Sequence, residues 1–164
     1  MPPGAKATFE NIFVALDFSE QSTEALDRAL AFARASGSNK VTCVHVYSVP
    51  IGYHKTGRSY DEFAEILEDN ARKEYDQLME KIDTRGVETS LVLELHKQPF
   101  QGIADLVHRE GADLLAVGAR GRSKTMAILL GSVSERLIEV CDIPIITVKP
   151  KGQGMSFLEA VLGL

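Results

Sequence analysis

Apolar runs and polar turns alternate along this chain of 164 residues in a pattern that predicts strand–helix units. Short apolar runs predict five strands, at residues 11–16, 40–47, 87–96, 114–117 and 144–149. The first run, Ile-Phe-Val-Ala-Leu, is too continuously apolar for a half-exposed strand and favours the middle of a parallel sheet. Repeated strand–helix units predict an α/β fold, an open five-stranded parallel sheet with helices on both faces.

The helices between these strands are predicted from their apolar faces and from the residues at their ends. In the first helix, Ser19 is the expected N-terminal cap and Gly37 the expected stop. Five apolar residues would share its buried face: Ala25, Leu26, Ala29, Leu30 and Ala33. A long amphipathic helix is expected over 63–82, and the last helix is expected to be capped by Ser132 with Glu135 completing a capping box.

Right-handed crossovers with the strand order 3-2-1-4-5 would place strands 1 and 4 side by side. The direction of winding reverses there, and a crevice opens at the carboxyl ends of the two strands. Asp17 follows strand 1, and Gly118 follows strand 4. The two motifs are therefore predicted to meet at one site.

The segment from Gly118 to Ser134 has the layout of a phosphate-binding loop. It joins a buried strand to a helix, and glycines stand where the backbone would bend sharply or approach a ligand. Arg120, Arg122 and Lys124 lie within it, and it contains no acidic residue. Positive charge next to a helix N-terminus attracts anions. The alternative is an ordinary polar surface loop that ends in a capped helix.

The spacing Gly-x2-Gly-x9-Gly-Ser, with glycines at 118, 121 and 131, resembles the nucleotide-binding signature of the universal stress protein family. The resemblance extends from about residue 9 to 150 and includes the opening Ile-Phe-Val-Ala-Leu-Asp-Phe-Ser and the closing Ile-Pro-Ile-Ile-Thr-Val. It implies that the chain binds ATP, with ADP and AMP as alternatives, together with Mg²⁺.

The same resemblance assigns expected roles to individual residues. Ala15 and Leu16 would form a wall beside the base, and Val117 would pack under it. The backbone of Val46 would bond the adenine edge, and Gly118 would face the ribose. The phosphates would be held by Gly121, Gly131, Ser132, Val133 and Ser134. A hydroxyl of Ser132 or Ser134 would also reach Mg²⁺, whereas Arg120 is assigned to the site on its charge alone.

Three further side chains near the crevice are open to two interpretations. Asp17 would contact the nucleotide, through ribose hydroxyls or a metal, or else would cap the first helix alongside Ser19. Phe18 stands where the family commonly has glycine, and it would narrow the pocket or stack on a ligand. His45 is interpreted as a core or rim histidine with satisfied hydrogen bonds.

These residues favour a nucleotide-dependent regulator or stress-response protein over two alternatives. One is a slow ATPase or phosphotransferase, against which the chain shows no Walker lysine pattern and no obvious positioned base. The other is a dimeric interaction module with a vestigial pocket, against which the signature glycines and Ser132 are intact.

Bulk properties limit the partners and the compartment. The net charge of −5 argues against nucleic acid, and no run of about 18 apolar residues predicts a membrane span. Two cysteines and an N-terminus without an apolar signal core favour the cytoplasm.

The chain is divided into a nucleotide-binding domain, residues 1–150, and an apolar tail, residues 151–164. The tail would pack on its own domain or dock a partner protein. The edge strand at 143–149 would pair two copies into a homodimer.

Overall fold

The computed structural model describes residues 9–119 and 131–149. Several residues discussed above lie outside the described residues: residues 1–8, the loop residues Arg120, Gly121, Arg122 and Lys124, and the tail at 151–164. The elements follow one another as β1 (Ile12–Ala15), α1 (Glu20–Ser36), β2 (Lys40–Tyr47), the short 3-10 helix η1 (Tyr53–Thr56), α2 (Tyr60–Met79), β3 (Glu88–Leu95), α3 (Pro99–Arg109), β4 (Leu114–Gly118), α4 (Ser132–Val140) and β5 (Ile145–Val148).

All strands belong to one parallel sheet in the order β3-β2-β1-β4-β5. This confirms the predicted order and puts β1 at the centre, with Ile12 opposite both Val41 of β2 and Leu114 of β4. At the amino end of β1, the carboxylate of Asp113 accepts hydrogen bonds from the backbone N–H groups of Glu10 and Asn11, at 2.7 and 3.1 Å. The start of β1 is thereby attached to the start of β4.

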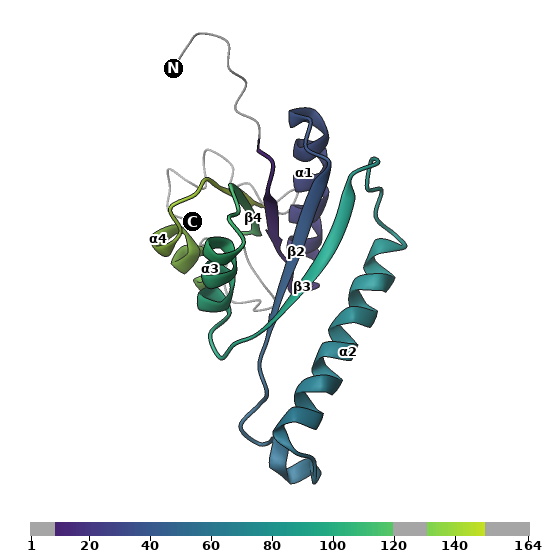
Figure 1. Ribbon diagram of the computed structural model, residues 1–164, viewed down its shortest axis with the longest axis vertical. Helices are drawn as coiled ribbons and strands as arrows, with labels where there is room; N and C mark the ends of the chain where they lie inside the picture. The colour runs from purple at the N-terminus through teal and green to yellow at the C-terminus, as the bar shows by residue number, and fades with distance from the viewer. Residues whose placement is uncertain (1–8, 120–130, 150–164) are drawn as a thin grey trace, which may run out of the picture.

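Helices cover both faces of the sheet, as the sequence predicts (Figure 1). One core cluster joins α1 and the second half of α2 to the sheet, with Tyr75 and Leu78 packed at its margin. The other joins α3 and α4 to the opposite face through residues such as Leu106 and Leu137. The inner strands β1, β2 and β4 are therefore largely buried between two apolar layers, which accounts for their apolar runs, whereas the edge strand β3 has no fully buried residue.

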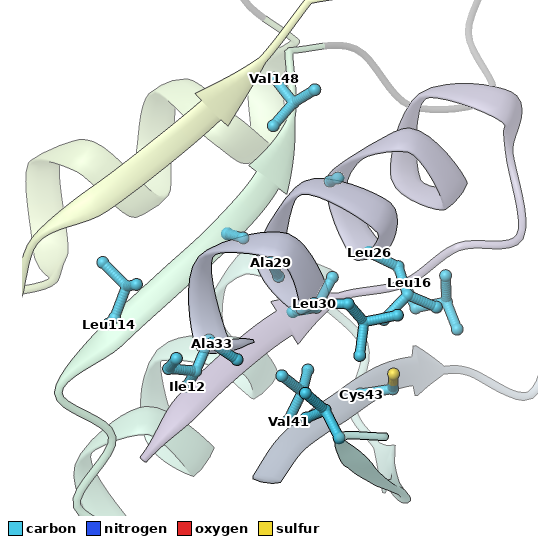
Figure 2. Packing of buried hydrophobic residues seen from close by; sticks show 14 residues of the cluster. Ile12, Leu16, Leu26, Ala29, Leu30, Ala33, Val41, Cys43, Leu114 and Val148 are labelled. Carbon is cyan, nitrogen blue, oxygen red and sulfur yellow. The ribbon is translucent and has the colours of Figure 1, made fainter. Parts of the chain in front are cut away.

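Helix α1 forms where its apolar spacing and its end residues predict it. Leu26, Ala29, Leu30 and Ala33 point from it onto the strands (Figure 2). The Ser19 hydroxyl accepts the N–H of Ser22 at the start, and Gly37 ends the helix in the left-handed conformation. The five apolar residues predicted for its buried face are all buried.

The capping box predicted for the last helix is wrong. Gly131 is the N-terminal cap of α4, Ser132 is its first helical residue, and no side chain caps it. A capping box is found instead at α2, where the Ser59 hydroxyl and the Glu62 carboxylate each accept the other's backbone N–H. The start of α4 is therefore held by backbone hydrogen bonds rather than by a capping side chain, and these bonds are part of the candidate site described below.

Candidate functional site

The carboxyl ends of β1 and β4 lie side by side at the point where the strand order reverses. Their register runs from Ile12 opposite Leu114 to Val14 opposite Ala116. Beyond these ends, α1 begins at Glu20 and α4 begins at Ser132. Because a helix N-terminus carries a partial positive charge and free N–H groups, the crevice is suited to an anion.

Backbone bonds bring the two ends of the glycine loop together. The N–H of Gly131 donates to the carbonyl of Ala119 at 2.6 Å, and the N–H of Ala119 donates to the carbonyl of Val148 at 2.7 Å. The Ser134 hydroxyl donates to the carbonyl of Gly118 at 2.7 Å. Gly118 therefore meets the start of α4 at the end of β4.

Gly118 is required by the packing of α1 against β4, which the sequence did not reveal. A Cβ at this position would lie 2.9 Å from the backbone carbonyl carbon of Gln21 and 3.0 Å from its oxygen. Backbone atoms in a packed helix cannot move aside as the end of a flexible side chain can. The absence of a side chain at 118 thus lets the first turn of α1 approach the sheet.

The Asp17 carboxylate shapes the turn that leads from β1 into α1. Its Oδ1 accepts hydrogen bonds from the backbone N–H of Ser19 at 3.0 Å and from the Ser19 hydroxyl at 2.5 Å. The Asp17 N–H donates to the Ser22 hydroxyl at 3.3 Å. The structure shows the helix-capping arrangement, and it holds the Asp17 carboxylate just beyond the carboxyl end of β1.

His45 and Phe18 support the same turn from the α1 side of the sheet. The His45 Nδ1 lies 2.8 Å from the Leu16 carbonyl, so this nitrogen carries the proton and donates. The Phe18 ring lies 4.8 Å from the His45 ring, centroid to centroid, at a tilt of 40°. Phe18 has a φ of 61°, which is the left-handed conformation that favours glycine.

Val46 offers its backbone to the crevice. The Val44 carbonyl accepts the N–H of Leu16, whereas the Tyr47 carbonyl accepts the N–H of His96 on the β3 side. Because the backbone groups of a strand alternate in direction, those of Val46 point to the same side as those of Val44. The pairing of β1 with β2 ends at Ala15 opposite Val44, so Val46 projects its N–H and C=O past the end of β1.

The other predicted base contacts differ in how far they reach the surface. The side chains of Leu16 and Val117 are each only 2% exposed and belong to the two core clusters on opposite faces. Ala15 and Val133 are half-buried and pack against the cluster on the α3 side. Because the backbone of Leu16 and Val117 is buried along with their side chains, neither residue as placed here offers appreciable surface to a ligand at this edge.

The two candidate metal ligands are not equivalent. Ser132 is exposed at the first position of α4, whereas Ser134 is 5% exposed and its hydroxyl is bonded to Gly118. Within residues 9–119 and 131–149, no group of three His, Cys, Asp or Glu side chains is placed to hold a metal. A divalent cation here would therefore depend on ligand phosphates and on Ser132.

Comparison with known proteins identifies the relatives of this chain. A family model described as the universal stress protein family matches residues 8–149. Universal stress protein MJ0577 of Methanocaldococcus jannaschii is 27% identical over 160 residues, covering 87% of this chain and 96% of the relative. Universal stress protein YxiE of Bacillus subtilis is 26% identical and covers 86% of this chain and 99% of the relative.

Solved structures share the fold. The structure of MJ0577 superimposes with a TM-score of 0.73 at 25% identity, covering 88% of this chain and 99% of that one. A universal stress protein in complex with cAMP gives 0.61 at 22% identity, covering 87% and 98%. An Arabidopsis thaliana universal stress protein family structure with AMP bound gives 0.58 at 20% identity, covering 92% and 99%.

Proposed function

Because this chain belongs to the universal stress protein family, we propose that it is a nucleotide-dependent regulator that binds ATP, with ADP or AMP as alternatives, between β1 and β4. The observation that carries this proposal is the junction at which Gly118, Ala119 and Gly131 are hydrogen-bonded beside two helix N-termini. Relatives solved with cAMP and with AMP support a nucleotide as the ligand.

Each part of the nucleotide is assigned to a group of the proposed site with matching charge or hydrogen-bonding character. The phosphates lie at the start of α4, where the N–H groups of Ser132 and Val133 belong to the first helical turn and Gly131, whose own N–H is bonded to the Ala119 carbonyl, leaves room for them by its lack of a side chain. The adenine edge pairs with the backbone of Val46, and the Asp17 carboxylate accepts hydrogen bonds from the ribose. Mg²⁺ neutralises phosphate charge beside the exposed Ser132. Arg120 and Gly121 complete the phosphate site in this proposal.

Equilibrium binding to the purified protein tests the proposal directly. Protein freed of co-purified ligand is titrated with ATP, ADP, AMP and cAMP, each with and without Mg²⁺. We expect saturable binding with ATP preferred, and tighter ATP binding when Mg²⁺ is present. If none of these nucleotides binds, the pocket is vestigial and the interaction-module alternative is correct.

We expect ATP turnover far below the roughly 1–100 s⁻¹ typical of kinases. Phosphoryl transfer needs a group that positions the nucleophile, and the cysteines do not supply one. Burial raises the pKa of Cys43 to about 12 and also raises the pKa of Cys141, so both thiols are protonated at neutral pH.

Steady-state phosphate release measures that turnover. Sustained hydrolysis in the kinase range, lost on Asp17→Ala or Ser134→Ala, would make the protein an enzyme. Wild-type hydrolysis that persists in both variants would point to a contaminating activity, and a repeat after further purification separates the two cases.

We also propose that the protein is a homodimer through residues 143–149. Within the described residues β5 pairs with β4 alone, and its other edge is open. On α4, the helix that precedes β5 in the chain, Ile138 and Val140 are 50% and 40% exposed. A two-fold axis would pair this edge with its copy and cover the apolar side chains.

Light scattering on the full chain and on a version that ends at Lys151 tests this assembly. We expect dimers in both, because the proposed interface lies before residue 151. Two monomers would overturn the dimer. A dimer only in the shorter chain would show that the tail, residues 151–164, covers the edge, and a dimer only in the full chain would make the tail the interface.

Three further proposals concern the domain boundary, the tail and the cellular compartment. We propose that residues 1–150 form the nucleotide-binding domain, that the tail contacts a partner protein and that the protein works in the cytoplasm. No helix in the described part of the chain has the length and apolar character needed to cross a membrane.

A further inference from the structure

The turn from Leu16 to Ser19 contains one peptide group whose two polar atoms are both held by side chains from other elements. The carbonyl of Leu16 accepts from the His45 Nδ1 at 2.8 Å. The N–H of the same peptide group, which belongs to Asp17, donates to the Ser22 hydroxyl at 3.3 Å. Because a peptide group is planar, fixing both atoms fixes the orientation of the plane and the direction in which the chain enters Asp17.

These two supports come from rigid parts of the molecule. His45 lies on β2, in the stretch that is paired with β3, and Ser22 is buried in the first turns of α1. Ser22 also donates its hydroxyl to the Ser19 carbonyl at 3.1 Å. The peptide between Leu16 and Asp17 is thus held between the sheet and the helix.

Phe18 adds a reason why this turn needs external support. A bulky residue with φ of 61° is in a conformation that costs energy, and such residues are held in place by their surroundings. The Phe18 ring packs on the His45 ring and on the core cluster on the α1 side. His45 therefore contacts the turn on both sides of Asp17, through the Leu16 carbonyl and through the Phe18 ring.

We infer that His45 is a positioning residue whose Nδ1–H bond to Leu16 aims the Asp17 carboxylate at the ribose, and that this bond thereby determines the preference for ribonucleotides over deoxyribonucleotides. This inference rests on the proposed function, in which Asp17 reads the sugar. It assigns His45 no contact with the ligand. Its effect on the sugar is transmitted by the turn, chiefly through the peptide between Leu16 and Asp17.

The test compares affinities for ATP and for 2′-deoxy-ATP and 3′-deoxy-ATP in two variants of nearly equal shape. Asn in place of His45 carries an amide N–H at the position of Nδ1, whereas Leu has the same size and no donor. Both lose the ring that packs on Phe18, so this loss is common to the two variants, and only Asn can still donate to the Leu16 carbonyl. Changes to base or phosphate contacts affect all three nucleotides alike and cancel in the affinity ratio.

We expect the wild type to prefer ATP over at least one deoxy analogue by about tenfold or more, the usual effect of a hydrogen bond to a charged group. His45→Leu should reduce that ratio to about threefold or less, and His45→Asn should retain most of it. Asp17→Ala serves as the reference in which the ratio disappears. Thermal unfolding without nucleotide shows that each variant is folded.

The possible outcomes distinguish a failure of this inference from a failure of the proposed nucleotide-binding function. If the wild type binds no nucleotide, the proposed function fails, and the inference fails with it. If the wild type discriminates, Asp17→Ala abolishes the ratio and His45→Leu retains it, the function stands and the inference is wrong. A wild type that binds all three equally also overturns the inference. If His45→Leu does not fold, Ser22→Ala removes the other support of the same peptide and should lower the ratio, and an unchanged ratio there overturns it.

Discussion

Replacing Gly131 with valine is expected to weaken ATP binding by at least about a hundredfold while the protein remains folded. Gly131 is the N-terminal cap of α4, with φ of −63° and ψ of 148°. Valine adopts this extended conformation readily, and it keeps the N–H that donates to the Ala119 carbonyl. A Cβ would instead obstruct the approach of phosphate to the N–H groups of the first helical turn.

Titration calorimetry and denaturant unfolding on the same preparations measure both effects. Valine is a poorer cap than glycine, so we allow a loss of up to about 1 kcal/mol in the free energy of unfolding. Gly131→Ala, with the smallest Cβ, should give an intermediate loss of affinity. A folded valine variant with wild-type affinity would disprove the phosphate site at the start of α4.

Replacing Gly118 with alanine is expected to have the opposite profile, with a loss of about 1–3 kcal/mol in the free energy of unfolding even without ligand. The new Cβ would lie 2.9 Å from the Gln21 carbonyl carbon. Helix α1 cannot shift to relieve this contact, because Leu26 and Leu30 are fully buried against the sheet. The strain therefore stays at the junction of β4 and α1.

Gly102→Ala is the matched control. A Cβ at 102 would lie 3.0 Å from the His96 Cβ and 3.0 Å from the Val46 Cγ1, which are side-chain atoms rather than backbone. We expect a smaller loss than at Gly118, measured by urea unfolding of both variants. If Gly118→Ala is as stable as the wild type, α1 is free to move away from β4 and our account of this glycine is wrong.

The strands and the first helix could be predicted from the sequence because each depends on a local pattern, and right-handed crossovers between such units then favour the observed strand order. The continuous apolar run from Ile12 and the Lys40–Tyr47 strand are found with nearly the predicted bounds. The spacing of apolar residues in α1, together with Ser19 and Gly37, specifies the helix and both of its ends. Each of these signals lies within the element that it predicts.

The details of the site depend on contacts between segments far apart in the sequence, and there the prediction was incomplete or wrong. The sequence predicts a ligand-facing glycine at 118 but does not show that the backbone of Gln21 approaches it. Ser132 was expected to cap α4, but the bonds among Ala119, Gly131 and Val148 place that role on Gly131. No pattern along the chain showed that His45 bonds the Leu16 carbonyl. One signal for the left-handed turn was present in the sequence, because Phe18 stands at a position where the resemblance implies glycine.

The central place of β1 in the sheet has a consequence for the order in which strands can pair while the chain is being synthesised. Strands β1, β2 and β3 leave the ribosome first and are neighbours in the sheet, so they can pair while synthesis continues. The pairing of β1 with β4, anchored by Asp113, closes a loop of roughly a hundred residues, and such long-range pairing forms slowly. The nascent chain therefore lacks its crevice until β4 and α4 have emerged, and a nucleotide that binds there stabilises only the finished chain.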